Sequence, residues 1–173
     1  MSQKSSLPQV IQSVSRVLPP DILDVYTVPW TLFEAGPRIA RTGSAYAIRK
    51  GRGKPIVHDL TDSLLIDNLE QAEIAQVFKR VETFVSYDPH TMYSALAVIA
   101  GCDSVVIPDH GVAVDSWCPD ETGRAGIAYG FEDIGRARST RDLLLEKLKK
   151  RDAANMASVQ NFVDFWRQRL NRS

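Results

Sequence analysis

The sequence lacks the features that would place it in a membrane or in an oxidising compartment. Its 173 residues include only two cysteines, Cys102 and Cys118, whose spacing fits neither a metal site nor a redox motif. No apolar run approaches the roughly 20 residues of a transmembrane helix. The amino terminus has no apolar core like that of a signal peptide. We therefore expect a cytoplasmic protein with no membrane span.

The sequence also lacks an excess of charge of either sign. Its 21 Lys and Arg residues balance its 21 Asp and Glu residues, and 44% of the residues are hydrophobic. These values are typical of a globular domain, and the length corresponds to one such domain. Because no overall field attracts polyanions, we expect no nucleic-acid partner, and any bound anion has to be held by local groups.

The chain divides at residue 42 in our interpretation. Residues 1–42 are predicted to form an N-terminal helix over residues 8–18, which ends before Pro19-Pro20, and an extended segment with a strand over residues 21–28. Residues 43–173 are predicted to form a Rossmann-like nucleotide-sugar-binding domain that ends in two helices. The first of these is indicated by Ser139 and Asp142, and the second by an apolar stripe between Val159 and Leu170.

Strand and helix patterns alternate after residue 43. Strands are predicted over 45–49, 63–66, 83–87 and 104–108, with a further short strand within 125–131. Asn68 and Gln71 resemble a capping box ahead of a helix, and Asp88 followed by Pro89 predicts an N-cap for a helix that runs to Gly101. The order strand, helix, strand implies parallel pairing. The predicted fold is α/β, a Rossmann-like three-layer sandwich with a mainly parallel sheet.

Polar side chains gather where three of these strands end. The clusters are Arg49-Lys50-Gly51, Ser86-Tyr87-Asp88 and Asp109-His110-Gly111. Ligands of open parallel sheets bind beyond the carboxyl ends of the strands. The helix predicted from Pro89 would offer free amides to a phosphate, with Thr91 and Ser94 in its first turns. Arg49, Lys50, Arg52 and Lys54 would supply the opposing cations.

Other interpretations of these residues stay open at this point. Asp88 can be an N-cap and nothing more, and the cations can form a solvated loop. Alternatively, Asp88, His90, Asp109 and His110 could converge on a metal ion in a hydrolase. A third possibility is a non-catalytic Rossmann-like module that binds a protein partner.

Several segments resemble a known family. They include RKGRGKPIVHDLTDSLLID, VETFVSYDPHTMYSALAVIAGCDSVVIPDHGV and GIAYGFEDIGRARSTRDLLLEKL. Over roughly residues 43–166 the sequence is similar to the C-terminal part of bacterial glycosyltransferases of the lipopolysaccharide-core type (WavQ-like proteins). The resemblance implies the C-terminal half of a GT-B enzyme, which binds the nucleotide-sugar donor. It also implies a separate or missing N-terminal domain, without which the chain is expected to be inactive.

The resemblance assigns residues to the donor by position. The expected donor-binding residues are Arg49, Lys50, Gly51, Ser86, Tyr87, Asp88, His90, Thr91, Ser94, His110 and Gly111. Residues 66–68 lie where the nucleobase is often contacted. No metal and no cofactor other than the donor substrate is expected. The paired-glutamate motif of many retaining GT-B enzymes is absent, because Pro89 and Ala97 occupy those positions. The catalytic residues therefore remain unassigned.

Overall fold

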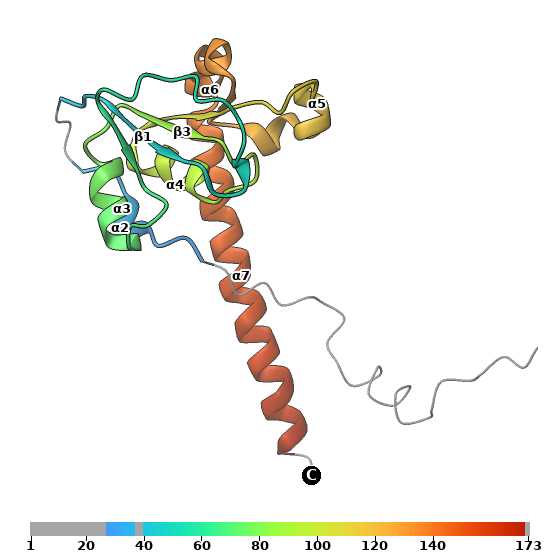
Figure 1. The fold of residues 1–173 in the computed structure, drawn as a ribbon. Helices are drawn as coiled ribbons and strands as arrows, with labels where there is room; N and C mark the ends of the chain where they lie inside the picture. The colour runs from blue at the N-terminus through green and yellow to red at the C-terminus, as the bar shows by residue number, and fades with distance from the viewer. Residues whose placement is uncertain (1–26, 37–39, 172–173) are drawn as a thin grey trace, which may run out of the picture. The chain divides into compact units, whose positions relative to one another are not determined.

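The computed structural model of the chain describes residues 27–36 and 40–171, and it contains one parallel five-stranded sheet (Figure 1). The strand order is β2-β1-β3-β4-β5. The strands are β1 (Ser44–Ala47), β2 (Ser63–Leu65), β3 (Thr83–Ser86), β4 (Asp103–Val106) and β5 (Ile127–Tyr129). All four neighbouring pairs are parallel, with Ala45 opposite Phe84 in the central pair. The predicted α/β fold with a mainly parallel sheet is confirmed.

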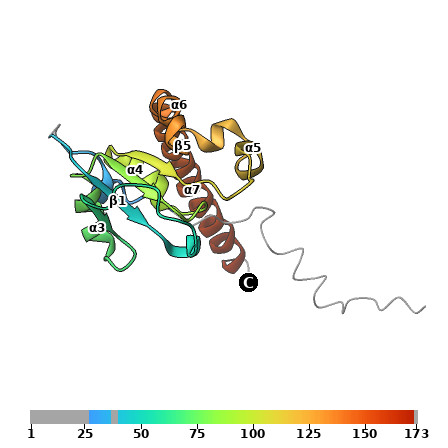
Figure 2. The same ribbon diagram turned by 45° about the horizontal axis from the view of Figure 1, so that its top comes forward.

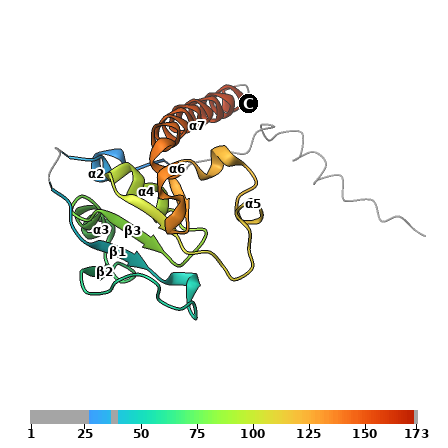
Figure 3. The same cartoon turned by 90° about the horizontal axis from the view of Figure 1, so that it is seen from above.

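Helices cover one face of the sheet and a helix and a loop cover the other. The first face packs against α2 (Trp30–Phe33), α3 (Gln71–Phe78), α4 (Tyr93–Ala100) and the start of α7 (Arg141–Leu170). In Figure 3, α2, α3 and α4 lie along one side of β1 and β3. The second face packs against α6 (Ile134–Ser139) and the loop after β1. A short helix, α5 (Val114–Trp117), lies in the long connection between β4 and β5 (Figure 2). The molecule therefore has three layers.

The direction in which strands are added reverses at β1. The chain passes from β1 outward to β2 and then crosses back over β1 to reach β3. Because parallel crossovers are right-handed, the connections before and after β2 lie on opposite faces of the sheet. The carboxyl ends of β1 and β3 therefore form a topological switch point, the place where open α/β sheets bind ligands.

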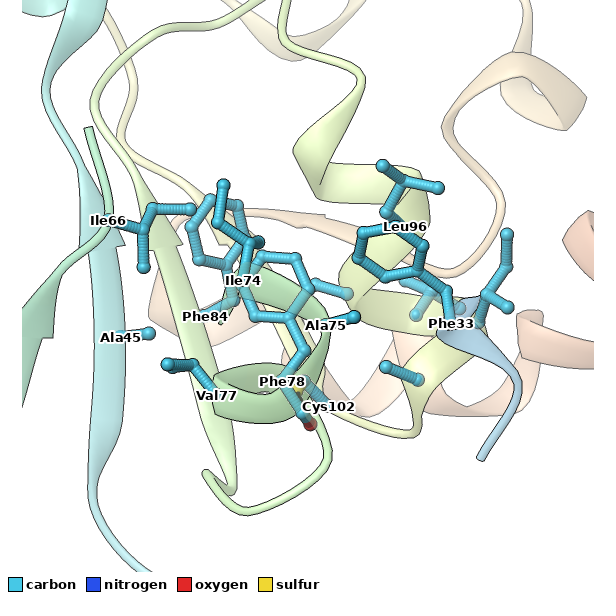
Figure 4. Close-up of a cluster of buried hydrophobic side chains, with 14 of the residues drawn as sticks. Phe33, Ala45, Ile66, Ile74, Ala75, Val77, Phe78, Phe84, Leu96 and Cys102 are labelled. Atoms are coloured by element: carbon cyan, nitrogen blue, oxygen red, sulfur yellow. Dashed lines mark hydrogen bonds between the residues drawn. The ribbon is translucent and has the colours of Figure 1, made fainter. Parts of the chain in front are cut away.

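Aromatic side chains fill the core between the sheet and its helices. Phe33, Phe78 and Phe84 are fully buried, and the ring centroids of Phe78 and Phe84 are 4.9 Å apart (Figure 4). Burying one such side chain stabilises the fold by about 1.5–3 kcal/mol. Phe33 reaches this core from α2, so α2 belongs to the compact unit that holds the sheet, which spans Val28–Lys149.

Two helix starts differ from the sequence-based expectation. The helix after β3 begins at Tyr93 and not at Pro89, although it ends as predicted at Gly101, whose φ is +103°. The capping box of α3 is formed by Glu70 and Glu73, not by Asn68 and Gln71.

The carboxyl-terminal helices also differ from the prediction. A single helix, α7, runs from Arg141 to Leu170 where two helices were expected from Ser139 onward. Leu144 and Leu148 of this helix are buried in the core. The predicted helix over 8–18 and most of the predicted strand over 21–28 lie outside the described residues.

Candidate functional site

Two adjoining pockets open at the carboxyl edge of the sheet. The first, the Asp67 pocket, has a volume of about 570 Å³ and is lined by Ile48, Arg49, Lys50, Arg52, Leu65, Asp67, Asn68 and Asp88. The second, the His110 pocket, has a volume of about 540 Å³ and is lined by residues 50–55, 57 and 107–110. Lys50 and Arg52 line both pockets. The ends of β1, β2, β3 and β4 thus contribute to one continuous region.

The turn after β1 is fixed by a carboxylate from the end of β2. The backbone N–H groups of Ile48 and Arg49 donate to the Asp67 carboxylate over 3.2 and 3.0 Å. Arg49 has a φ of +40°, a left-handed conformation that costs a residue with a side chain about 1–2 kcal/mol. Asp67 therefore holds Arg49 in a strained conformation at the edge of the Asp67 pocket. Asp67 and Asn68 also line this pocket, so the nucleobase contact that the family resemblance implies stays a prediction.

The cluster Arg49-Lys50-Gly51 lies directly against the end of β3. A Cβ atom placed on Gly51 would be 2.2 Å from the Tyr87 carbonyl oxygen, so only glycine permits this approach of the two backbones. The Arg49 guanidinium lies over the ring of Tyr93, 4.5 Å from its centroid. The structure therefore brings together the first two polar clusters and the first turn of α4.

The amides at the start of α4 are already hydrogen-bonded within the turn that precedes the helix. Tyr93 N–H donates to Thr91 Oγ1 over 3.3 Å, and Ser94 N–H donates to the Thr91 carbonyl over 3.4 Å. The Asp88 carboxylate accepts from His90 N–H over 3.1 Å, which makes an Asx turn instead of a helix cap. The helix predicted from Pro89 onward is thus replaced by a turn before Tyr93, and the predicted helix start was wrong.

Several predicted site residues are buried instead of facing the pockets. Ser86 and Tyr87 are fully buried, and Ser86 Oγ donates to the Asp88 carbonyl. Ser94 is 3% exposed, and its hydroxyl has no hydrogen-bond partner among the described residues. Asp88 is 4% exposed but lines the Asp67 pocket. The residues at the end of β3 therefore lie mainly behind the surface of the pockets, and the loop after β1 contributes the polar groups that solvent can reach.

The third polar cluster borders the His110 pocket. His110 is exposed and lines the pocket, whereas Gly111 and His90 are exposed outside both pocket linings. Lys54 Nζ is 2.8 Å from the Asp109 carboxylate and also donates to the Ile107 carbonyl. Lys54 therefore joins the loop after β1 to the loop after β4 and is not available as a free cation, contrary to the expectation.

Positive charge predominates around the Asp67 pocket. Arg49, Lys50 and Arg52 face the two carboxylates of Asp67 and Asp88, which gives an excess of one positive charge. Lys50 and Arg52 form no ion pair with any residue in the described ranges 27–36 and 40–171. These two side chains are therefore free to contact a bound anion.

The described residues give no support for a metal centre. No group of three or more His, Cys, Asp or Glu side chains in this part of the chain is placed to hold a metal ion. Asp88 and His90 are joined through the Asx turn, while Asp109 pairs with Lys54. The arrangement that a metal-dependent hydrolase would need is therefore not assembled by Asp88, His90, Asp109 and His110.

Comparisons with protein-family models, with curated proteins and with solved structures found no match for this chain. No helix within the described residues is both long and apolar enough to cross a membrane.

Proposed function

We propose that the Asp67 and His110 pockets bind a nucleotide-sugar donor through its diphosphate, and that the chain is the donor-binding domain of a glycosyltransferase. The main support is the placement of Arg49, Lys50 and Arg52 around a pocket at the β1/β3 switch point. The guanidinium of Arg52 and the ammonium of Lys50 form no ion pair with another described residue, and they suit a group that carries two or three negative charges. Such cations would also stabilise the charge on the leaving nucleotide.

The size of the paired pockets supports a ligand with two parts. Each pocket holds more than 500 Å³, which is within the range of small-molecule sites, and Lys50 and Arg52 lie where the two meet. A diphosphate at this junction would leave one pocket for each of its substituents. Transfer to an acceptor is proposed to need a further domain, so we expect binding without turnover by this chain alone.

Calorimetric titration with UDP, GDP, ADP and CDP, each with and without Mg²⁺, tests this function. We expect a dissociation constant in the micromolar-to-millimolar range for at least one of them. Lys50→Ala should weaken it by roughly ten- to a hundredfold, because a hydrogen bond to a charged group contributes about 1.5–3 kcal/mol. Arg49→Ala should have a similar effect. Binding should also weaken with salt, since the contacts are mainly between charges.

Arg80→Ala is the matched control. Arg80 is an exposed cation just before the amino end of β3, at the opposite edge of the sheet. Its removal changes the net charge as Lys50→Ala does but should leave the dissociation constant unchanged. If no nucleoside diphosphate binds, or if both variants weaken binding equally, the proposed donor site is wrong. A stable protein complex in place of nucleotide binding would instead favour the partner-binding module.

A further inference from the structure

His58 lies at the centre of a hydrogen-bond chain that joins a loop to the sheet. We call residues 52–61 the latch loop. His58 Nδ1 is 2.7 Å from Tyr87 Oη, and His58 Nε2 is 3.0 Å from Ser63 Oγ. Val57 N–H donates to the same Tyr87 oxygen over 2.9 Å, and Ser44 Oγ donates to Ser63 Oγ over 2.7 Å. The chain thus connects the latch loop with β1, β2 and the end of β3.

The burial of Tyr87 decides which nitrogen of His58 carries the proton. Tyr87 is fully buried, so its hydroxyl hydrogen needs an acceptor from the protein. Val57 N–H already occupies one lone pair of this oxygen, and His58 Nδ1 is the acceptor within hydrogen-bond distance. Nδ1 is therefore unprotonated, and Nε2–H donates to Ser63 Oγ. In this state the Tyr87 hydroxyl and both imidazole nitrogens have hydrogen-bond partners, and Nε2 is not available as a base toward Ser63.

Protonation of His58 would break this pattern. A hydrogen on Nδ1 would point at Tyr87 Oη, and the tyrosine hydroxyl hydrogen would then lose its acceptor in a buried place. The imidazole also packs against the Tyr46 ring, with 4.8 Å between centroids. The side chains that face it from β1, from β2 and from the residue after β3 are Tyr46, Ser63 and Tyr87. Its nearby charged group is Asp59, an exposed residue of the latch loop itself.

The latch loop carries groups that line the pockets. Arg52 lines both pockets, and Lys54 and Val57 line the His110 pocket. Besides the His58 chain, the contact of Lys54 with Asp109 and Ile107 holds the loop at its other end. We propose that His58 is a pH-sensitive latch, whose neutral imidazole holds residues 52–61 against the sheet and whose protonation releases them. The proposal concerns the loop and does not depend on the identity of a ligand.

The sign of the pH dependence follows from the environment of the imidazole. Burial lowers the pKa of His58 below its ordinary value, and Asp59 opposes this effect in part. The released loop would have an ordinary histidine pKa of about 6.5. Attachment is therefore complete above about pH 6.5 and weakens as the pH falls from there toward the lowered pKa of the attached state. Within that window one proton changes the opening equilibrium by up to about tenfold per pH unit.

The test is amide hydrogen exchange of the intact chain, followed by NMR between pH 7.5 and pH 5.0 and corrected for intrinsic exchange rates. In the wild type we expect protection of the Val57 amide to fall by up to about tenfold per pH unit below pH 6.5. His58→Gln cannot become charged, so its Val57 protection should not change with pH. His90→Gln is the matched control, because His90 is exposed outside both pocket linings, and it should behave like the wild type.

The wild type alone also gives a decisive measurement if His58→Gln does not fold. The imidazole pKa of His58, measured from its ring resonances, should lie below 6.5, and latch-loop amide shifts should follow the same titration. A His58 pKa above 6.5 would overturn the latch. So would Val57 protection that is constant with pH in the wild type, or that falls equally in His58→Gln. None of these results bears on nucleotide binding at pH 7.5, which tests the proposed function separately.

Discussion

Replacement of Gly51 by alanine tests the contact on which the shape of the site depends. The added Cβ would lie 2.2 Å from the Tyr87 carbonyl oxygen and 2.4 Å from the Tyr87 carbonyl carbon. Neither atom can rotate away, because both belong to the backbone that leaves β3. Overpacking of a buried position costs about 1–3 kcal/mol. We expect a value near 3 kcal/mol, since relief requires the Arg49–Gly51 turn to move from the sheet.

Gly53→Ala is the control from the same loop. Gly53 has open space around its Cα atom, and its φ of +97° leaves only conformational strain, about 1–2 kcal/mol. Urea denaturation should therefore give a larger loss of unfolding free energy for Gly51→Ala. For a chain of this length, a loss near 3 kcal/mol lowers Tm by roughly 6–12 °C. If Gly51→Ala is no more destabilising than Gly53→Ala, the close approach between the two backbones is not as described.

Two further substitutions test the energetics of individual site residues. Ser94→Ala should raise the free energy of unfolding by about 1 kcal/mol, because a buried hydroxyl without a hydrogen-bond partner is costly. Nucleotide binding should stay unchanged. A loss of stability in urea denaturation would show that the Ser94 hydroxyl does have a hydrogen-bond partner. Arg49→Gly should be more stable than Arg49→Ala by about 1 kcal/mol, since both lack the guanidinium but only glycine adopts φ +40° without strain. Equal melting temperatures for the two Arg49 variants would contradict the strained conformation.

The strands and their common edge could be predicted because the relevant signals are local. Short apolar runs rich in β-branched residues mark β3 and β4, and parallel pairing then places their carboxyl ends together. The proximity of Arg49 to the end of β3 follows from this topology without knowledge of any contact. Gly101 could be identified as the end of α4 because its left-handed conformation is a common requirement there.

The start of α4 could not be predicted because one dipeptide suits two structures. Asp followed by Pro is favoured at an N-cap and N1 pair, and also in the first two positions of a type I turn. In this chain the Asp88 carboxylate accepts a hydrogen bond from the amide two residues later, so the dipeptide forms a turn and the helix starts after it. The continuous α7 did have a local signal, since residues 141–170 contain neither glycine nor proline. The apolar residues near its start and those near its end were interpreted as two separate helices.

Contacts between distant residues gave no signal in the sequence. Lys54 pairs with Asp109, and His58 pairs with Tyr87, which is 29 positions away in the chain. Both contacts depend on the path of the loop after β1 over the second face of the sheet. This path is set by Gly51, which lets the loop turn at the end of β3, and by Asp67, which holds the preceding amides.

Recognition by side chains, as opposed to helix amides, has consequences for the proposed site. Helix-terminal amides form a rigid anion site, whereas Lys50 and Arg52 are exposed side chains, and Arg52 belongs to the latch loop that the His58 chain and Lys54 hold in place. The position of Arg52 then depends on the attachment of the latch loop. An anion bound between Lys50, Arg52 and Arg49 would in turn hold the loop against the sheet. Anion binding and attachment of the loop to the sheet are therefore expected to stabilise each other. Each event restricts the motion of the loop, so the other event has less conformational entropy to lose.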